Sequence, residues 1–214
     1  MTPEIPLILR LKRSSYKKIA EAQDLIIQEL YKVFDKAVLH GGTSLWRCYN
    51  GNRFSEDIDV YIPRNMKKIN RLFENFERAG FVLEKKKIGE NSIYSNLSFN
   101  GTFVRFEVLF KTVRGFLKEY TKADGNSIIV YTLTPEELIL EKSTTYQKRL
   151  KIRDLYDVFF LLRYVTINDK ISKSLSNLIN DFKKPIDEGD LRVIIIEGVV
   201  PSVGDMVRRI RQEI

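Results

Sequence analysis

The sequence predicts a mixed α/β (α+β) fold in two parts, with strands and helices up to residue 132 and mainly helices after it. Segments rich in β-branched and aromatic residues predict strands at 81–86, 93–99, 102–110 and 128–132. Beyond residue 135 helix-like patterns dominate, apart from a β-like run at 191–197 that has no evident partner. We therefore predict two domains, 1–132 and 133–214.

Local signals define the other elements of the first part. Residues 14–36 have the pattern of an amphipathic helix that leads into a short apolar strand at 37–39. A second helix is predicted at 66–79 and ends at Gly80, since glycine readily adopts the left-handed conformation that closes a helix. The pair Asn100-Gly101 is typical of a two-residue turn, so we expect a hairpin between the strands on either side of it.

A double glycine follows the first apolar strand. The run Gly41-Gly42-Thr43-Ser44 predicts a sharp turn out of the strand and then a helix, with Thr43 as its N-cap. Backbone N–H groups at the start of a helix have no partner within the helix, and they bind phosphate oxygens well. The turn is therefore a candidate phosphate site.

Two aspartates with one residue between them come shortly afterwards. Residues 57–62 read as a strand, and alternate residues of a strand point to the same face, so Asp57 and Asp59 are expected to lie side by side. Like charges at this distance repel unless a cation lies between them. Magnesium, which prefers hard oxygen ligands, is the natural candidate. The alternative is a strand end with two solvated aspartates, and the phosphate-binding turn upstream favours the metal.

Together these residues resemble nucleotidyltransferases of the AbiEii/AbiGii toxin type, in the DNA polymerase β-like superfamily. The resemblance extends over roughly residues 38 to 163 and rests on three stretches: Gly41 to Leu45 leading to Arg53 to Asp59, Glu141-Lys142 with Arg149, and Arg153 to Asp157. It implies a core with a mixed sheet flanked by helices, an NTP substrate and Mg²⁺ as the cofactor.

The resemblance also implies a third carboxylate on a neighbouring strand. Glu107 is the only acid in the strand predicted at 102–110, and it shares a face with Arg105 and Leu109. The alternative is a glutamate on an edge strand that is solvated or paired with arginine. The expected metal ligands are thus Asp57, Asp59 and Glu107, and all three are expected to be catalytic.

Further residues are expected to bind the nucleotide. Thr134 and Pro135 begin a helix, as N-cap and first helical residue. Lys142 and Arg149 lie seven residues apart in it, so they share a face and could reach one phosphate chain. A solvated basic face is the alternative. The complete expected set is Gly41, Gly42, Thr43, Ser44, Arg53, Ser55, Lys142 and Arg149.

Asp154 has two interpretations. It precedes a strongly apolar segment, with Asp157 three residues later, which is the pattern of a helix N-cap followed by an acid in the first turn. In the resembled family, however, an aspartate at the matching position is needed for activity, so Asp154 is also a candidate catalytic residue. Both roles are compatible.

Composition limits the cellular setting and the partners. The single cysteine, Cys48, permits no intrachain disulfide, and the apolar run within residues 1–11 is too short for a signal peptide. No segment has the length of a membrane span, so we expect a cytoplasmic protein without a membrane partner. The formal charge of +8 favours polyanions such as tRNA or other RNA, although a solvated lysine-rich surface explains it equally well.

The expected function follows from the resemblance. The chain would move a nucleotidyl group from an NTP to an acceptor hydroxyl, on a tRNA end or a protein side chain, as the toxin of a toxin–antitoxin system whose antitoxin is a separate protein. Two alternatives stay open: a small-molecule (antibiotic-type) nucleotidyltransferase, and a catalytically inactive nucleotide-binding interaction module. A P-loop nucleotidase is excluded, because the sequence lacks the G-x-x-x-x-G-K-[ST] motif.

Overall fold

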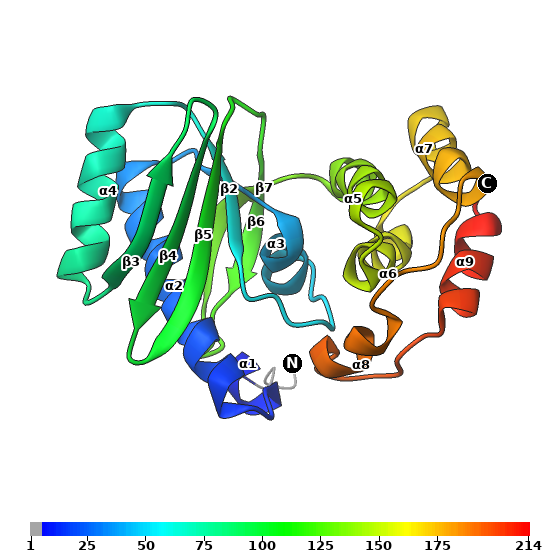
Figure 1. The fold of residues 1–214 in the computed structure, drawn as a ribbon, viewed down its shortest axis with the longest axis horizontal. Helices are drawn as coiled ribbons and strands as arrows, with labels where there is room; N and C mark the ends of the chain where they lie inside the picture. Colours follow the sequence, from blue (N-terminus) through cyan, green and yellow to red (C-terminus); the bar gives the residue numbers. More distant parts are fainter. Residues whose placement is uncertain (1–5) are drawn as a thin grey trace. The chain divides into compact units, whose positions relative to one another are not determined.

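The protein, analysed as a computed structural model that describes residues 6–214, consists of two compact units, Met1–Thr132 and Leu133–Ile214 (Figure 1). The first part of the apolar run at 1–11 lies outside the described residues. Within residues 6–214, every helix is too short or too polar to cross a bilayer.

The first unit is built on a mixed sheet. Its described residues form seven strands in the order β3-β4-β5-β2-β1-β7-β6, in which the pairs β2–β5 and β1–β7 are parallel and the others antiparallel. The strands are β1 Val38–His40, β2 Ile58–Ile62, β3 Val82–Ile88, β4 Ser92–Phe99, β5 Thr102–Phe110, β6 Phe116–Thr121 and β7 Ser127–Thr132. The helices of this unit are α1 Leu7–Arg10, α2 Ser14–Val33, α3 Gly41–Cys48 and α4 Met66–Arg78.

One face of this sheet is apolar and packs against helices. Ile58, Val60 and Ile62 of β2 are fully buried, whereas the residues between them are partly exposed. Phe106 of β5 contacts the Phe76 ring of α4 edge to face, with 5.4 Å between ring centroids. Helices α2 and α4 lie side by side on this side of the sheet (Figure 1). The alternating residues of β2 and β5, including the acidic ones, therefore point to the opposite face.

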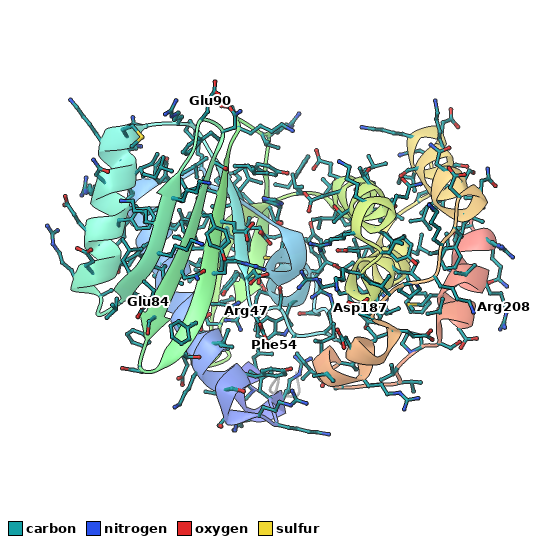
Figure 2. The ribbon with its side chains drawn as sticks, in the orientation of Figure 1. Arg47, Phe54, Glu84, Glu90, Asp187 and Arg208 are labelled. Atoms are coloured by element: carbon teal, nitrogen blue, oxygen red, sulfur yellow. The ribbon has the colours of Figure 1, made fainter. Side chains whose placement is uncertain are left out.

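Helix α3 is held in the first unit by a buried arginine. The Arg47 side chain, labelled in Figure 2, is fully buried and forms an ion pair with Asp24 of α2. It also donates to the Ala20 carbonyl and to the Tyr120 hydroxyl of β6, both at 3.0 Å. Burial raises the pKa of Asp24, and the charge of Arg47 partly offsets this rise. Arg47 thus ties α3 to a helix and to a strand at once.

The second unit is helical. Its helices are α5 Pro135–Arg149, α6 Ile152–Leu161, α7 Asp169–Asn180, α8 Leu191–Ile194 and α9 Val203–Arg211, with 3₁₀ turns at Leu162–Tyr164 and Glu188–Asp190. Helix α5 begins with a full capping box, in which Thr134 and Glu137 each accept a hydrogen bond from the other's backbone N–H. The predicted start of this helix is confirmed.

Most predicted elements of the first unit are confirmed to within a few residues. The hairpin turn is present, with positive φ at Asn100 (48°) and Gly101 (73°). Strand β6 was not predicted, because its charged residues hide the strand pattern, as is common at a sheet edge. The β-like run at 191–197 was misread: its first four residues form α8, since tertiary packing readily overrides a weak β-propensity.

Candidate active site

The turn between β1 and α3 begins the site. Helix α3 starts at Gly41, two residues before the predicted start, and the side chain of His40 at the N-cap position makes no capping hydrogen bond. The prediction that Thr43 caps the helix is therefore wrong. The Thr43 hydroxyl instead donates to the carbonyl of Asp57. This bond joins the glycine turn to the segment that carries the carboxylates.

The double glycine is required by close packing. Gly41 has a φ of +68°, and a Cβ at this position would lie 2.2 Å from Oδ2 of Asp59. A Cβ on Gly42 would lie 2.5 Å from the Ser55 Oγ and 2.6 Å from an Arg53 guanidinium nitrogen. Only glycine lets the backbone approach these groups so closely. The turn and the Arg53–Asp59 segment, separate in the sequence motif, are thus one packed unit.

We expect Ala in place of Gly41 to displace the Asp59 carboxylate and to strain the backbone. Activity should fall by about a hundredfold, the size of effect that a 1 Å misplacement of a catalytic group can have. Folding should weaken by at least about 1–2 kcal/mol because of the left-handed conformation. Steady-state kinetics and urea unfolding of the same variant measure both effects.

Gly101→Ala is the matched control. Gly101 also has a positive φ of 73°, but a Cβ there would meet nothing within 4 Å, so this variant carries only the backbone strain. It should lose a similar amount of stability without loss of transfer. Equal activities for the two alanine variants would show that the contact between Gly41 and Asp59 has no catalytic importance.

The strand register brings Asp59 and Glu107 together. Strand β2 begins at Ile58, so Asp57 lies just before it rather than within it. Asp59 is the register partner of His40 on β1 and of Glu107 on β5. Directly paired residues on adjacent strands are about 5 Å apart and point to the same face. Glu107 is therefore on a central strand, and the carboxylate pair spans two parallel strands.

Arg105 forms ion pairs with two of the three carboxylates, Asp57 and Glu107. Its guanidinium forms an ion pair with Asp57, and its Nε lies 2.9 Å from Oε1 of Glu107. Glu107 is thus paired with arginine and is the register partner of Asp59, and its role as a metal ligand stays a prediction. Arg105 therefore supplies a positive charge beside Asp57 and Glu107 in the absence of metal.

The electrostatics at this face follow from the three carboxylates and the guanidinium of Arg105. Burial and the negative charges of Asp59 and Asp57 raise the pKa of Glu107, while Arg105 and His40 oppose the rise. Burial tends to lower the pKa of Arg105, but the carboxylates of Asp57 and Glu107 raise it above its usual value. Arg105 therefore stays charged under all ordinary conditions.

The remaining predicted nucleotide-binding residues of the first unit are buried and hold the turn. Ser44 Oγ lies 2.5 Å from Thr132 Oγ1 on the last strand. Arg53 donates to the Phe54 carbonyl at 3.1 Å, and the Ser55 carbonyl accepts from Gln23 at 2.9 Å. These contacts support the shape of the turn, and direct binding of nucleotide by Ser44, Arg53 and Ser55 stays a prediction.

A cavity of about 250 Å³ opens beside the carboxylates. Its lining includes His40, Asp59, Ser92, Tyr94, Glu107 and Leu109. The ring of His40 stacks on Tyr61, with centroids 3.9 Å apart. Ser92 and Tyr94 had no sequence signal, because their place beside Glu107 depends on the β4–β5 register. The hairpin turn at Asn100 was the one local feature from which this register follows.

The predicted residues of the second unit form an ionic cluster in which Lys142 is buried and Arg149 is exposed. Lys142 is only 5% exposed, and its Nζ lies 2.9 Å from Asp157 and 3.6 Å from Asp154. Arg149 makes two hydrogen bonds to Asp154, at 2.6 and 2.8 Å. Both aspartates are fully buried. A solvated face, the alternative for Lys142, is therefore excluded, and its contact with triphosphate stays a prediction.

The N-cap interpretation of Asp154 is wrong. Helix α6 begins at Ile152, two residues earlier, and the N–H of Ile152 donates to the carboxylate of Asp187 at 2.7 Å. Asp187, labelled in Figure 2, thus satisfies the helix start from a distant part of the chain. Because this leaves Asp154 free of capping, its carboxylate instead accepts hydrogen bonds from Arg149.

Comparison with known proteins identifies the family. The family model described as "Nucleotidyl transferase AbiEii toxin, Type IV TA system" matches residues 27–197, well over half of the chain. The chain belongs to the AbiEii family. It is therefore a nucleotidyltransferase, and the resemblance stated from the sequence motifs is confirmed. None of the curated proteins matches the AbiEii-family chain significantly.

Solved structures agree on the fold of this AbiEii-family chain. JHP933 from Helicobacter pylori is similar with a TM-score of 0.67 and 17% identity, over 92% of this chain and 89% of that one. A second Helicobacter pylori structure, described as a candidate nucleotidyltransferase, has a TM-score of 0.64 and 17% identity, over 94% and 92% of the two chains. The predicted α+β fold is confirmed.

The carboxylate face of the AbiEii-family chain has suitable chemistry for a divalent metal. Asp57, Asp59 and Glu107 offer hard oxygen donors from adjacent backbone segments, as Mg²⁺ prefers. In residues 6–214, however, no three acidic, histidine or cysteine side chains are gathered closely enough to form a complete metal site. Arg105 is paired with two of the three carboxylates. The three donors suit magnesium by type, and its binding there stays a prediction.

Proposed function

We propose that this AbiEii-family chain transfers a nucleotidyl group from an NTP to an acceptor hydroxyl with the help of Mg²⁺. The observation that carries the proposal is the strand register, which pairs Asp59 with Glu107 on one face and packs the Gly41 turn against Asp59. A carboxylate pair beside a turn rich in backbone N–H groups is suited to hold a metal and a phosphate chain together.

Each part of the site has a role in this reaction. The acceptor oxygen attacks the α-phosphorus, the bond to the β-phosphate oxygen breaks, and pyrophosphate leaves. Asp57, Asp59 and Glu107 would hold Mg²⁺, which when bound neutralises phosphate charge and lowers the pKa of the acceptor hydroxyl. The turn at Gly41 and Gly42 would bind the β- and γ-phosphates through backbone N–H groups. As an alternative to holding the metal, Glu107 would accept the proton of the acceptor hydroxyl directly.

The second unit would contribute the remaining groups. We propose that Lys142 or Arg149 contacts the triphosphate and that Asp154 orients them, since Asp154 already binds both cations. We propose Met1–Thr132 as the nucleotidyltransferase core domain and Leu133–Ile214 as a helical C-terminal domain. A cation on the phosphate chain would contribute to ground-state binding as well as to catalysis.

The acceptor and the biological role are further proposals. We propose a tRNA end or a protein side chain as the acceptor, and a toxin role opposed by a separate antitoxin. The description of the matched family as a toxin of a Type IV toxin–antitoxin system supports the role. The net charge of +8 favours a polyanionic acceptor such as RNA.

The decisive experiment measures transfer of a labelled nucleotidyl group to an acceptor. The purified chain is incubated with each NTP labelled at the α-phosphate, with Mg²⁺ or with EDTA, and with total RNA or total cell protein. We expect label in one acceptor pool, from one preferred NTP, only when Mg²⁺ is present. Release of pyrophosphate should accompany it in equal amount. Absence of both labelled acceptor and pyrophosphate with all four NTPs would refute the proposal.

A further inference from the structure

The position of Arg105 raises a question that catalysis alone does not answer. Its side chain lies on the carboxylate face of β5 and contacts Asp57 and Glu107, two of the three proposed magnesium ligands. The side chains are partly exposed, at 37% for Arg105, 17% for Asp57 and 39% for Glu107. A guanidinium at this place binds the same kind of oxygen that the metal needs.

The two cations are expected to compete. A carboxylate oxygen bound to a guanidinium has its lone pairs engaged, and a divalent ion nearby would repel the positive charge of Arg105. Without any cation, the acidic face would carry three negative charges at close range, which disfavours the folded state. Arg105 therefore supplies in the metal-free protein the positive charge that a metal would supply in the loaded one.

We propose that Arg105 is a positioning residue that holds Asp57 and Glu107 in the metal-free protein and leaves at least one of them when Mg²⁺ binds. Arg105 thereby lowers the affinity of the free protein for metal. This inference rests on the proposed function, because it takes the three carboxylates as the metal site. It assigns Arg105 no contact with the reacting atoms.

The arginine side chain suits this role better than lysine. Its planar fork presents separate donors: a terminal nitrogen donates to Asp57, whereas Nε lies 2.9 Å from Glu107 as an ion pair without hydrogen-bond geometry. A lysine has a single point charge and would engage one carboxylate well at most. Arg105→Lys is therefore an intermediate variant, which keeps the charge but not the bridge.

Metal binding without nucleotide tests the inference directly. The affinities of wild type, Arg105→Lys and Arg105→Gln for Mg²⁺ and Mn²⁺ are measured by isothermal titration calorimetry. We expect Arg105→Gln to bind metal about tenfold more tightly, a typical size for coupling between two binding events, and Arg105→Lys to lie between. The Tm of Arg105→Gln should be lower than that of wild type without metal and should rise more when metal is added.

Arg64→Gln is the control for loss of a positive charge. Its guanidinium stacks over the Phe110 ring, 5.7 Å from the centroid, at the end of the same strand. Its metal affinity should match that of wild type. A tenfold gain in this variant as well would overturn the inference, because it would indicate a general effect of net charge.

Other outcomes separate this inference from the proposed function. If wild type binds metal, Asp59→Asn does not, and Arg105→Gln binds no more tightly than wild type, only the role of Arg105 fails. If no variant binds metal, both proposals fail. If Arg105→Gln does not fold, the comparison rests on Arg105→Lys, and an affinity equal to or below that of wild type then overturns the inference.

Discussion

Replacing Asp59 by Asn should abolish nucleotidyl transfer and leave the fold intact. The loss of one metal ligand removes several kcal/mol of transition-state stabilisation, which corresponds to a rate loss of about a thousandfold or more. The fold should keep its stability, because the charge of Asp59 adds to the repulsion that raises the pKa of Glu107. Transfer of labelled nucleotide and the thermal midpoint are measured on the same sample.

Two further variants sharpen this test. Glu90→Gln, at an exposed acid in the turn after β3, removes a charge from the same unit and should change neither activity nor Tm. Asp57→Asn should abolish transfer too, but it also breaks the ion pair with Arg105 and should lower the Tm. A stable Asp59→Asn protein with full activity would disprove the proposed mechanism.

Replacing Lys142 by Met should destabilise the second unit strongly. Asp157, which is fully buried, would lose the ammonium group that lies 2.9 Å away. Breaking a buried pair in this way costs about 3–5 kcal/mol. Urea unfolding measures the loss, and the double variant Lys142→Met with Asp157→Asn should recover much of it, because the buried charge is then gone.

Lys173→Met provides the control for this variant. Lys173 is an exposed lysine on α7, so its replacement should leave the free energy of unfolding within about 0.5 kcal/mol of wild type. If Lys142→Met unfolds like wild type while its KM for NTP rises, the buried pair has no structural importance, and the triphosphate contact predicted from the helix spacing gains support.

The features of the site that could be predicted were those that depend on residues close together in the sequence. The period of two along residues 57–62 and 102–110 placed Asp59 and Glu107 on definite faces of their strands, and the Asn100-Gly101 pair fixed one hairpin. Asp59 and Glu107 lie on the same face of the sheet because β2 pairs in parallel with β5, and these two strands are far apart in the sequence. No local pattern specifies such a register, so the neighbourhood of Asp59 and Glu107 rested on resemblance until the fold was known.

The incorrect predictions of side-chain roles have a common physical cause. Thr43 and Asp154 are good N-cap residues by type, but α3 and α6 each begin two residues earlier, and the two side chains hydrogen-bond to the Asp57 carbonyl and to Arg149 instead. The solvated face considered for Lys142 could not be excluded from the sequence. Its burial depends on two aspartates of the next helix, which the pattern of its own helix does not indicate. Side-chain roles that depend on distant partners are invisible to a local pattern.

The anchoring of α3 by Arg47 has a consequence for nucleotide affinity. The glycine turn is the first turn of an eight-residue helix whose last turn is locked to α2 and β6. A flexible loop loses conformational entropy, roughly 1–2 kcal/mol per residue, when it closes around a ligand. Here that freedom is already lost when the chain folds, so the phosphate binding that we propose for the turn would lose little energy to loop ordering.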